Sequence, residues 1–188
     1  MTLPHGENPY QTFKHELLHE RRYVKFYRDL VKMGELEKDY SYMAVDDSVG
    51  IVALNDKGEV ALVGQWRYPI AEYHWEIPAG MAEAGETPLE NAKRELMEEA
   101  GVSAEKWTEL GSYQMDASKM RQQNFLFLAE GLTVGDNAPM EDEKLERLWL
   151  PLEEALALVE NGEIRDGLTV IGLLRAQAHL QKKVPPRP

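Results

Sequence analysis

The hydrophobic residues of the chain fall mostly into short runs of strand length. Residues 49–54 and 59–66 are apolar runs joined by the turn sequence Asn-Asp-Lys-Gly, so we expect two strands that pair as a hairpin in a well-buried sheet. Residues 72–78 form a further extended segment that leads into a loop at Ala79 and Gly80. Later strands are expected at residues 107–115, 124–128 and 145–150, with a polar loop at residues 131–139.

Three segments carry the period and the end signals of helices. Thr87 can cap the first helix, Pro88 suits its first position, and Glu90 completes a capping box. Gly101 suits the left-handed residue that ends a helix, so this helix should cover residues 88–100. Later helices are expected from residue 152 to about residue 162, and over residues 168–182 behind a cap at Asp166.

The N-terminal part of the chain shows weaker patterns. Residues 1–13 indicate an extended lead-in, and residues 23–31 and 39–44 predict strands of a small antiparallel sheet. We therefore divide the chain into an N-terminal extension with this sheet, residues 1–46, and a main domain, residues 47–188. Mixed strands with helices between and after them indicate an α/β (α+β) sandwich with one central sheet.

Composition disfavours several classes of function. The 188 residues carry a net charge of −12 without a basic stripe, which argues against a surface for nucleic acid or for an anionic membrane. No run approaches the roughly 18 apolar residues of a membrane span, and the first residues lack the apolar core of a signal peptide, so we expect a cytoplasmic protein. Cysteine is absent, which excludes disulfides, thiolate ligands and a cysteine nucleophile. The five histidines share no ligand spacing, and we assign them no chemistry.

The first predicted helix gathers carboxylates beside its apolar face. At about 100° per residue, Glu95, Glu98 and Glu99 fall within an arc of about 100°, where their like charges repel one another. Arg94 lies four residues before Glu98 and can pair with it. Oxygen ligands without histidine or cysteine suit Mg²⁺ or Mn²⁺ and argue against zinc. For an isolated pair of glutamates, a solvated acidic face would be the better interpretation.

The spacing around these glutamates is specific. Residues 80–102 match the Nudix box at every defined position. The match consists of Gly80, five residues, Glu86, seven residues, Arg-Glu-Leu, one residue, Glu-Glu, one residue and Gly-Val. On this resemblance the chain is identified as a member of the Nudix hydrolase family. The resemblance implies an α-β-α sandwich with a mixed central sheet, and hydrolysis of a nucleoside diphosphate linked to another moiety.

The same resemblance assigns roles to the box residues. It implies that Glu95 and Glu99 are the primary ligands of a divalent metal, with Glu98 as an additional or water-mediated ligand. The carbonyl of Ala79 would join them. Glu98 and Arg94 also count among the residues that we expect to take part in catalysis.

The residues before the box narrow the resemblance. QWRYPIAEYHWEIPAG, residues 65–80, is similar to the segment that enters the box in ADP-ribose pyrophosphatases and related nucleoside diphosphate sugar hydrolases. This similarity implies that Arg67 contacts the diphosphate and that Met81 lies against the substrate. The local pattern alone allows Arg67 equally well to form a salt bridge with Glu72 or Glu76.

An acidic cluster, Glu141, Asp142 and Glu143, precedes the last predicted strand. By pattern alone a charged loop of this kind is most often solvated. In the resembled enzymes a glutamate of the corresponding loop is the base that acts on the attacking water, and Glu143 aligns best with it; a slip in register would select Glu141. A carboxylate on a movable loop suits this role, because it can approach the water after the site has filled.

Aromatic side chains near the N-terminus have two interpretations. Tyr23, Phe26 and Tyr27 most simply pack the small sheet. In the resembled subfamily this sheet is exchanged across a homodimer and contributes to the nucleobase pocket, so a homodimer with such a role is the second interpretation.

These inferences predict a hydrolase that uses Mg²⁺ or Mn²⁺ to cleave the diphosphate of ADP-ribose or a related nucleoside diphosphate sugar. Glu143 would take the proton from the water, while Arg67 holds the phosphate that is not attacked. The alternatives are GDP-mannose or a dinucleoside polyphosphate as the substrate, and a module of the same fold that binds a nucleotide without cleaving it.

Overall fold

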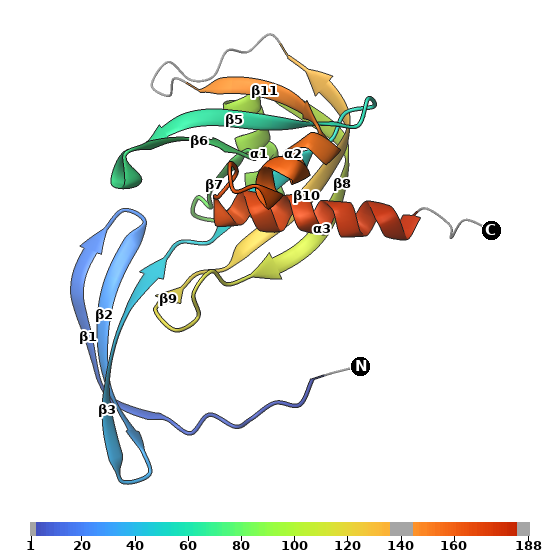
Figure 1. Ribbon diagram of the computed structural model, residues 1–188. Coiled ribbons are helices and arrows are strands. Elements are labelled where there is room, and N and C mark those ends of the chain that lie inside the picture. Colours follow the sequence, from blue (N-terminus) through green and yellow to red (C-terminus); the bar gives the residue numbers. More distant parts are fainter. Residues whose placement is uncertain (1–2, 136–144, 184–188) are drawn as a thin grey trace. The chain divides into compact units, whose positions relative to one another are not determined.

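The computed structural model describes residues 3–135 and 145–183, and the chain divides into two compact units (Figure 1). The first unit contains Met1–Asp46 and Gln114–Gln122, and the second contains Asp47–Tyr113 and Gln123–Pro188. Within the described residues, no helix is both long and apolar enough to cross a membrane.

The first unit is a four-stranded sheet in the order β1-β2-β3-β9 (Figure 1). Its strands are β1 (Gln11–Arg21), β2 (Val24–Met33), β3 (Leu36–Val45) and β9 (Met120–Arg121). The first three strands are antiparallel neighbours, and β9 runs parallel to β3. The lead-in predicted over residues 1–13 is wrong at its end, because β1 already begins at Gln11. All residues of β1 except Glu16 are exposed, so this strand has no apolar face that a sequence pattern would reveal.

The second unit contains two sheets. The first sheet, in the order β7-β4-β10-β8, is built from β4 (Ser48–Ala53), β7 (Ala79–Met81), β8 (Val102–Tyr113) and β10 (Asn124–Val134). The second, in the order β11-β5-β6, is built from β5 (Glu59–Arg67), β6 (Glu72–Glu76) and β11 (Glu146–Pro151), with the 3-10 turn η1 (Tyr68–Ile70) between β5 and β6. Only the β4–β10 pair is parallel among these strand pairs of the described chain, so the first sheet is mixed.

The hairpin predicted for residues 49–54 and 59–66 is wrong. The turn itself forms, since the Asn55 carbonyl accepts from the Gly58 N–H at 3.0 Å. Beyond the turn, however, the two runs share a single isolated bridge, and β4 and β5 enter different sheets. Every residue of β4 is buried, as are residues 60–64 of β5. A strand that is buried on both faces is apolar throughout, so its sequence does not indicate which strand pairs with it. The single central sheet that we predicted is in fact two sheets.

Two predicted strands are longer than expected, and one predicted loop is a strand. β8 begins at Val102, immediately after the first helix, and β10 continues to Val134, inside the expected polar loop. The two strands pair along this whole length. Ala79 and Gly80 lie in β7, which pairs with β4, and do not form a loop.

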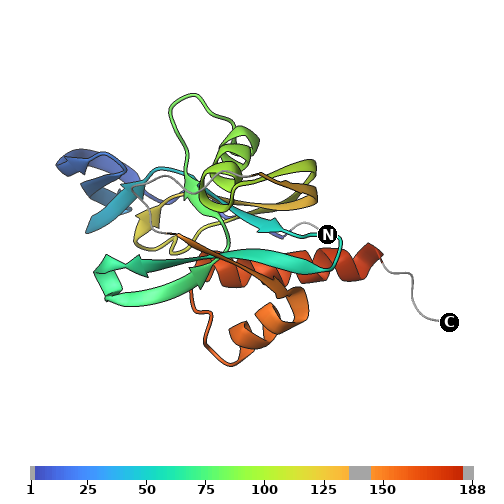
Figure 2. The same ribbon diagram turned by 90° about the horizontal axis from the view of Figure 1, so that it is seen from above.

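Helices cover both sides of the sheets in the second unit. They are α1 (Pro88–Ala100), α2 (Leu152–Glu160) and α3 (Gly167–Lys183). Val49 and Ile51 of β4 pack with Leu96 of α1, whereas Val52 packs with Leu173 of α3. β4 thus sends alternate side chains to opposite helices, and Figure 2 shows α1 on one side of the sheets and α3 on the other. The predicted α-β-α sandwich is confirmed.

Candidate active site

Helix α1 begins and ends at the predicted residues. Thr87 Oγ1 accepts from the Glu90 N–H at 3.3 Å, and the Glu90 carboxylate accepts from the Thr87 N–H at 2.8 Å, which completes the capping box. Gly101 leaves the helix with a φ of 62° in the left-handed region. These ends fix the rotation of the helix, and with it the side that Glu95 and Glu99 share.

Gly80 allows Glu95 to approach the backbone of β7. A Cβ atom at Gly80 would lie 2.0 Å from the carboxyl carbon and from Oε1 of Glu95, which is far inside van der Waals contact. Only glycine has room for this carboxylate. The room that Glu95 needs therefore explains why the box motif begins with a glycine.

The segment before Gly80 is held by hydrogen bonds on several sides. The Ala79 N–H donates to Glu99 Oε2 at 2.7 Å, and the Pro78 carbonyl accepts from the Ile51 N–H of β4 at 2.9 Å. One residue earlier, the Ile77 N–H donates to the buried hydroxyl of Thr169 on α3 at 3.1 Å. The backbone of Ala79 is thereby fixed next to the Glu99 carboxylate.

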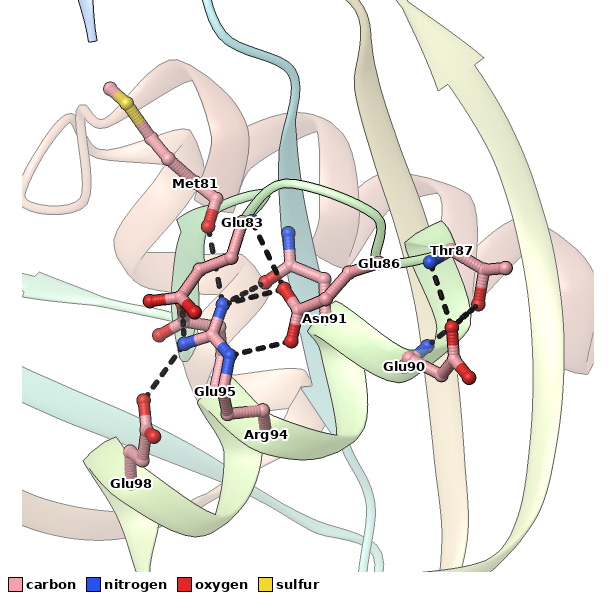
Figure 3. Close-up of polar contacts among 9 residues, drawn as sticks. All are labelled: Met81, Glu83, Glu86, Thr87, Glu90, Asn91, Arg94, Glu95 and Glu98. Atoms are coloured by element: carbon pink, nitrogen blue, oxygen red, sulfur yellow. Dashed lines mark hydrogen bonds and ion pairs between the residues drawn. The ribbon is translucent and has the colours of Figure 1, made fainter. Parts of the chain in front are cut away.

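Arg94 binds three carboxylates at once (Figure 3). Its Nε donates to Glu86 Oε1 at 2.8 Å and its Nη2 to Glu86 Oε2 at 3.0 Å, a bidentate pair. Its Nη1 donates to Glu95 Oε1 at 2.7 Å and to Glu98 Oε2 at 2.9 Å. The predicted pair between Arg94 and Glu98 is present, but it is one arm of a larger cluster.

Two further acceptors complete the surroundings of Arg94. Nη2 also donates to the Asn91 side-chain oxygen at 2.8 Å and to the Met81 carbonyl at 3.3 Å. The guanidinium thus links α1 to the end of β7. Met81 meets Arg94 through its backbone, and its side chain points away from the guanidinium in Figure 3.

The cluster is largely withdrawn from solvent. Glu95 and Glu99 are 8% and 9% exposed, so their charges are stabilised by protein partners more than by water. The hydrogen bond with Glu86 is the main cause that raises the pKa of Arg94, and the same bond lowers the pKa of Glu86. Arg94 and Glu86 therefore keep their charges near neutral pH.

The donor set suits a divalent cation, although it is not already arranged around one. Within residues 3–135 and 145–183, no three His, Cys, Asp or Glu side chains converge as a group that could hold a metal ion. Glu95 and Glu98 turn toward Arg94, and Glu99 toward the Ala79 N–H. Glu95 nevertheless lies next to Gly80 and Glu99 next to Ala79 of β7, and Glu98 shares Arg94 with Glu95. An all-oxygen set is the kind that Mg²⁺ and Mn²⁺ prefer. The residues fit such an ion once these carboxylates rotate.

Arg67 forms the salt bridge that was the alternative to a phosphate contact. Its Nε donates to Oε1 of the buried Glu76 at 2.9 Å, and its Nη2 bonds the other oxygen. This hydrogen bond is the main cause that raises the pKa of Arg67. The side chain is still 41% exposed. Contact with a diphosphate stays a prediction.

The remaining predicted residues divide into two groups. Glu141 and Glu143 lie outside the described residues. In the first unit, Tyr27 stacks on Tyr42 with ring centroids 5.5 Å apart, while Phe26 is 40% exposed near His19. The aromatic side chains thus pack partly on their own sheet, as the simpler interpretation expects.

Sequence reasoning missed two residues that shape the site. Asn91 is fully buried and binds Arg94, and Thr169 anchors Ile77 from a helix 92 residues away in the chain. Asn91 gave a local signal, because it lies three and four residues before Arg94 and Glu95 on the same side of the helix. Thr169 gave none.

Comparison with known proteins gives consistent matches. The protein-family model of the NUDIX domain matches residues 44–169 of this chain. An ADP-ribose pyrophosphatase of Mycobacterium tuberculosis (strain ATCC 25618 / H37Rv) is 32% identical over 189 residues, which cover 97% of this chain and 90% of that protein. An ADP-ribose pyrophosphatase of Bacillus subtilis (strain 168) is 37% identical over 128 residues, 67% of this chain and 69% of the relative. A crystal structure of an ADP compounds hydrolase superposes with a TM-score of 0.84 over 96% of this chain and 98% of the other, at 21% identity, which is a likeness of fold.

Proposed function

The chain belongs to the Nudix family and is a Nudix pyrophosphohydrolase, and from this premise we propose that it hydrolyses the diphosphate bond of ADP-ribose or a related nucleoside diphosphate sugar. The products would be a nucleoside monophosphate and a sugar phosphate. The family, the fold class and the enzyme class predicted from the sequence are confirmed by this membership. The observation that carries the proposal is that Glu99 of α1 binds the Ala79 N–H of β7, while Arg94 of the same helix holds Glu95 and Glu98.

The proposed ligands of a divalent ion are Glu95, Glu98, Glu99 and the Ala79 carbonyl. Mg²⁺ or Mn²⁺ bound there would neutralise charge on the diphosphate and acidify the attacking water. Gly80 keeps the space between β7 and Glu95 free of a side chain. The hydrogen bonds at Ile77 and Pro78 hold the Ala79 backbone in place, so that the ligands have a fixed support on one side.

The protein's own charged groups have separate roles in the proposal. Arg94 orients Glu95 and Glu98 and offsets the repulsion between their carboxylates. Arg67, steered by its pair with the buried Glu76, offers its exposed edge to the phosphate that is not attacked. Met81 lies against the substrate. Glu143 takes the proton from the water, with Glu141 as the alternative.

Assembly and location complete the proposal. We expect a homodimer in the cytoplasm that acts on a small anionic molecule and has no nucleic-acid or membrane partner. The exposed apolar side chains on the strands of the first unit, Phe13, Leu17, Leu18 and Phe26, support a partner surface there.

The test is a comparison of substrates and of one ligand variant. Purified protein with Mg²⁺ or Mn²⁺ should cleave ADP-ribose to AMP and ribose 5-phosphate with a higher kcat/KM than GDP-mannose or a dinucleoside polyphosphate. Glu99→Gln should lower kcat by about 100-fold or more, whereas the control Glu160→Gln, at the exposed end of α2, should not change it. Calorimetric binding of ADP-ribose without turnover at any divalent metal would show a binding module instead.

A further inference from the structure

The start of helix α3 is tied to the backbone that leads into β7. Thr169 is fully buried, and its Oγ1 lies 3.1 Å from the Ile77 nitrogen and 2.8 Å from Asp166 Oδ2. The same Asp166 oxygen accepts from the Thr169 N–H at 2.8 Å, so Asp166 caps the helix. Asp166, the Thr169 hydroxyl and the Ile77 N–H thus form a continuous chain of hydrogen bonds, which we call the α3 relay.

The direction of each hydrogen bond in the relay is fixed by chemistry. A backbone N–H can only donate and a carboxylate can only accept, whereas a hydroxyl has one proton and can do both. Thr169 therefore donates its proton to Asp166 and turns a lone pair toward the Ile77 N–H. Removal of the Asp166 acceptor would free the hydroxyl to rotate away from this arrangement.

Two glycines allow α3 to come this close to the sheet. A Cβ at Gly172, three residues after Thr169, would lie 2.7 Å from Cδ1 of Ile77. A Cβ at Gly50 of β4 would lie 2.9 Å from Cγ of Leu168 and 3.1 Å from the same Ile77 atom. The Ile77 side chain therefore occupies the space that both glycines leave, and its backbone comes within reach of Thr169.

Ile77 stands between two parts of the candidate active site. The residue before it, Glu76, holds Arg67, and two residues after it comes Ala79, whose carbonyl is a proposed metal ligand. Pro78 lies between them and has no N–H of its own. The Ile77 N–H is therefore the nearest donor on this side by which the chain leading to Ala79 can be held, and the threonine hydroxyl is its acceptor.

We propose that Asp166 and Thr169 are positioning residues, which hold the Ala79 carbonyl where a divalent metal ion needs it. The inference rests on the proposed function, because it explains how one of the proposed ligands is placed. Asp166 sets the rotation of the Thr169 hydroxyl, which holds the Ile77 N–H. The ring of Pro78 then limits how far the backbone can turn before Ala79.

The charge of Asp166 is a different route by which it could act on the site. The hydrogen bond with Glu76 is the main cause that raises the pKa of Arg67, and the Asp166 charge adds to it. Asp166→Asn separates the two routes, because both hydrogen bonds at Asp166 end on one oxygen, which an amide oxygen can replace. This variant should keep the relay and lose the charge, whereas Asp166→Ala loses both.

The relay is tested first on the protein without metal or substrate. In ¹⁵N-labelled protein, the Ile77 amide should exchange with deuterium about 5-fold faster in Thr169→Val, which has nearly the same shape and no hydroxyl. This change is measured relative to the buried Leu62 amide of β5, which reports general loosening. Thr169→Ser should restore the slow exchange. Unaltered relative exchange of the Ile77 amide in a folded Thr169→Val variant would overturn the proposal.

The link to the metal site is tested with Mn²⁺ alone and then with substrate. By electron paramagnetic resonance, Thr169→Val and Asp166→Ala should bind Mn²⁺ about 10-fold more weakly than the unaltered protein, and Thr169→Ser and Asp166→Asn within about twofold of it. In ADP-ribose hydrolysis, the first two variants should need about 10-fold more Mn²⁺ for the half-maximal rate and recover kcat to within about threefold at saturating Mn²⁺. A variant that is only less well folded would lose rate at every Mn²⁺ concentration.

Thr133→Val is the control, because it removes a threonine hydroxyl from an exposed position of β10. Folded Thr169→Val and Asp166→Ala variants with unaltered Mn²⁺ affinity would overturn the positioning role. An equal loss of affinity in Asp166→Asn and Asp166→Ala would assign the effect to charge and would also overturn it. If the unaltered protein binds Mn²⁺ and cleaves no diphosphate, the proposed function fails, while deuterium exchange and Mn²⁺ titration still decide the relay.

Discussion

Two arginines bind carboxylates in this molecule, Arg94 in the second unit and Arg28 in the first. Arg28 Nε lies 3.0 Å and Nη2 2.6 Å from Asp39 Oδ2, and Nη1 lies 3.7 Å from Glu16. In bond lengths this pair matches the Arg94 cluster. The side chains of Arg28 and Asp39 are 42% and 48% exposed, however, against 24% for Arg94 and 11% for Glu95.

The comparison shows that the hydrogen bonds are alike and that solvation differs. Water can replace either partner of the Arg28 pair, so the pair adds little to stability. At Arg94 the carboxylates are partly desolvated and repel one another, so loss of the guanidinium leaves charges that water reaches poorly. A cluster of like charges gathered around a half-buried arginine is typical of a functional site.

The largest difference is expected when each arginine is removed. Arg94→Met should lower the free energy of unfolding by about 2 to 4 kcal/mol, because Glu95 loses a close cationic partner. It should also reduce kcat/KM by about 100-fold. Arg28→Met should shift the melting temperature by less than about 2 °C and leave kcat/KM unchanged. Urea unfolding, thermal unfolding and ADP-ribose hydrolysis of both variants measure these quantities. Equal losses in the two variants would contradict the comparison.

A smaller difference in stability and activity is expected when a glycine of each unit is replaced by alanine. Gly80→Ala places a methyl group 2.0 Å from the Glu95 carboxyl carbon, so Glu95 must move away from β7. We expect a destabilisation of about 1 to 3 kcal/mol and a fall in kcat of about 10- to 100-fold. Gly6→Ala is the control, because nothing lies within 4 Å of its added Cβ. Normal kcat in Gly80→Ala would show that the position of Glu95 has no part in the reaction.

The cap of α1 should have a more modest effect. Thr87→Ala removes the acceptor for the Glu90 N–H and should cost about 1 kcal/mol of stability. Because the same helix carries Arg94 and the glutamates, kcat should fall a few-fold at a temperature where its first turn frays. Thr87→Ser, which keeps the hydroxyl, should restore both values. A loss in Thr87→Ser as large as in Thr87→Ala would assign the effect to packing.

The sequence predicted those features that depend on neighbours in the chain. The ends of α1 follow from Thr87, Glu90 and Gly101, which act within one turn of it. The Arg94–Glu98 pair follows from its spacing of four residues. The Nudix box then identified the family, because its fixed spacings are a property of the sequence.

Features that depend on distant residues could not be predicted in this way. The apolar strands β4 and β5 carry no mark of their partners, so adjacency in sequence was mistaken for pairing. Glu86 reaches Arg94 only because the chain before α1 folds back on the helix. Local pattern left Arg67 undecided between Glu72 and Glu76. The β5–β6 register places Glu72 opposite Arg67, but the long arginine side chain binds Glu76, and a sequence does not give the direction of a side chain.

The smallest expected effect is the acid response of the exposed pair. The hydrogen bond from Arg28 lowers the pKa of Asp39 below its ordinary value of 3.8. A carboxyl group with a lowered pKa in the folded state stabilises the protein above its unfolded pKa, and this contribution is lost as the pH falls through the lowered value. Stability from Asp39 should thus be complete at pH 6 and decline below about pH 4.

Asp39→Asn should remove only this component. We expect a melting temperature slightly below that of the unaltered protein at pH 6, and a difference that shrinks at pH 3 and in 1 M salt, where exposed charges are screened. NMR titration of the Asp39 carboxyl at low salt and in 1 M salt measures the pKa itself. A salt-resistant shift would mean that Arg28 and Asp39 are shielded from water like the Arg94 cluster, and the contrast between the two arginines would then have to rest on function alone.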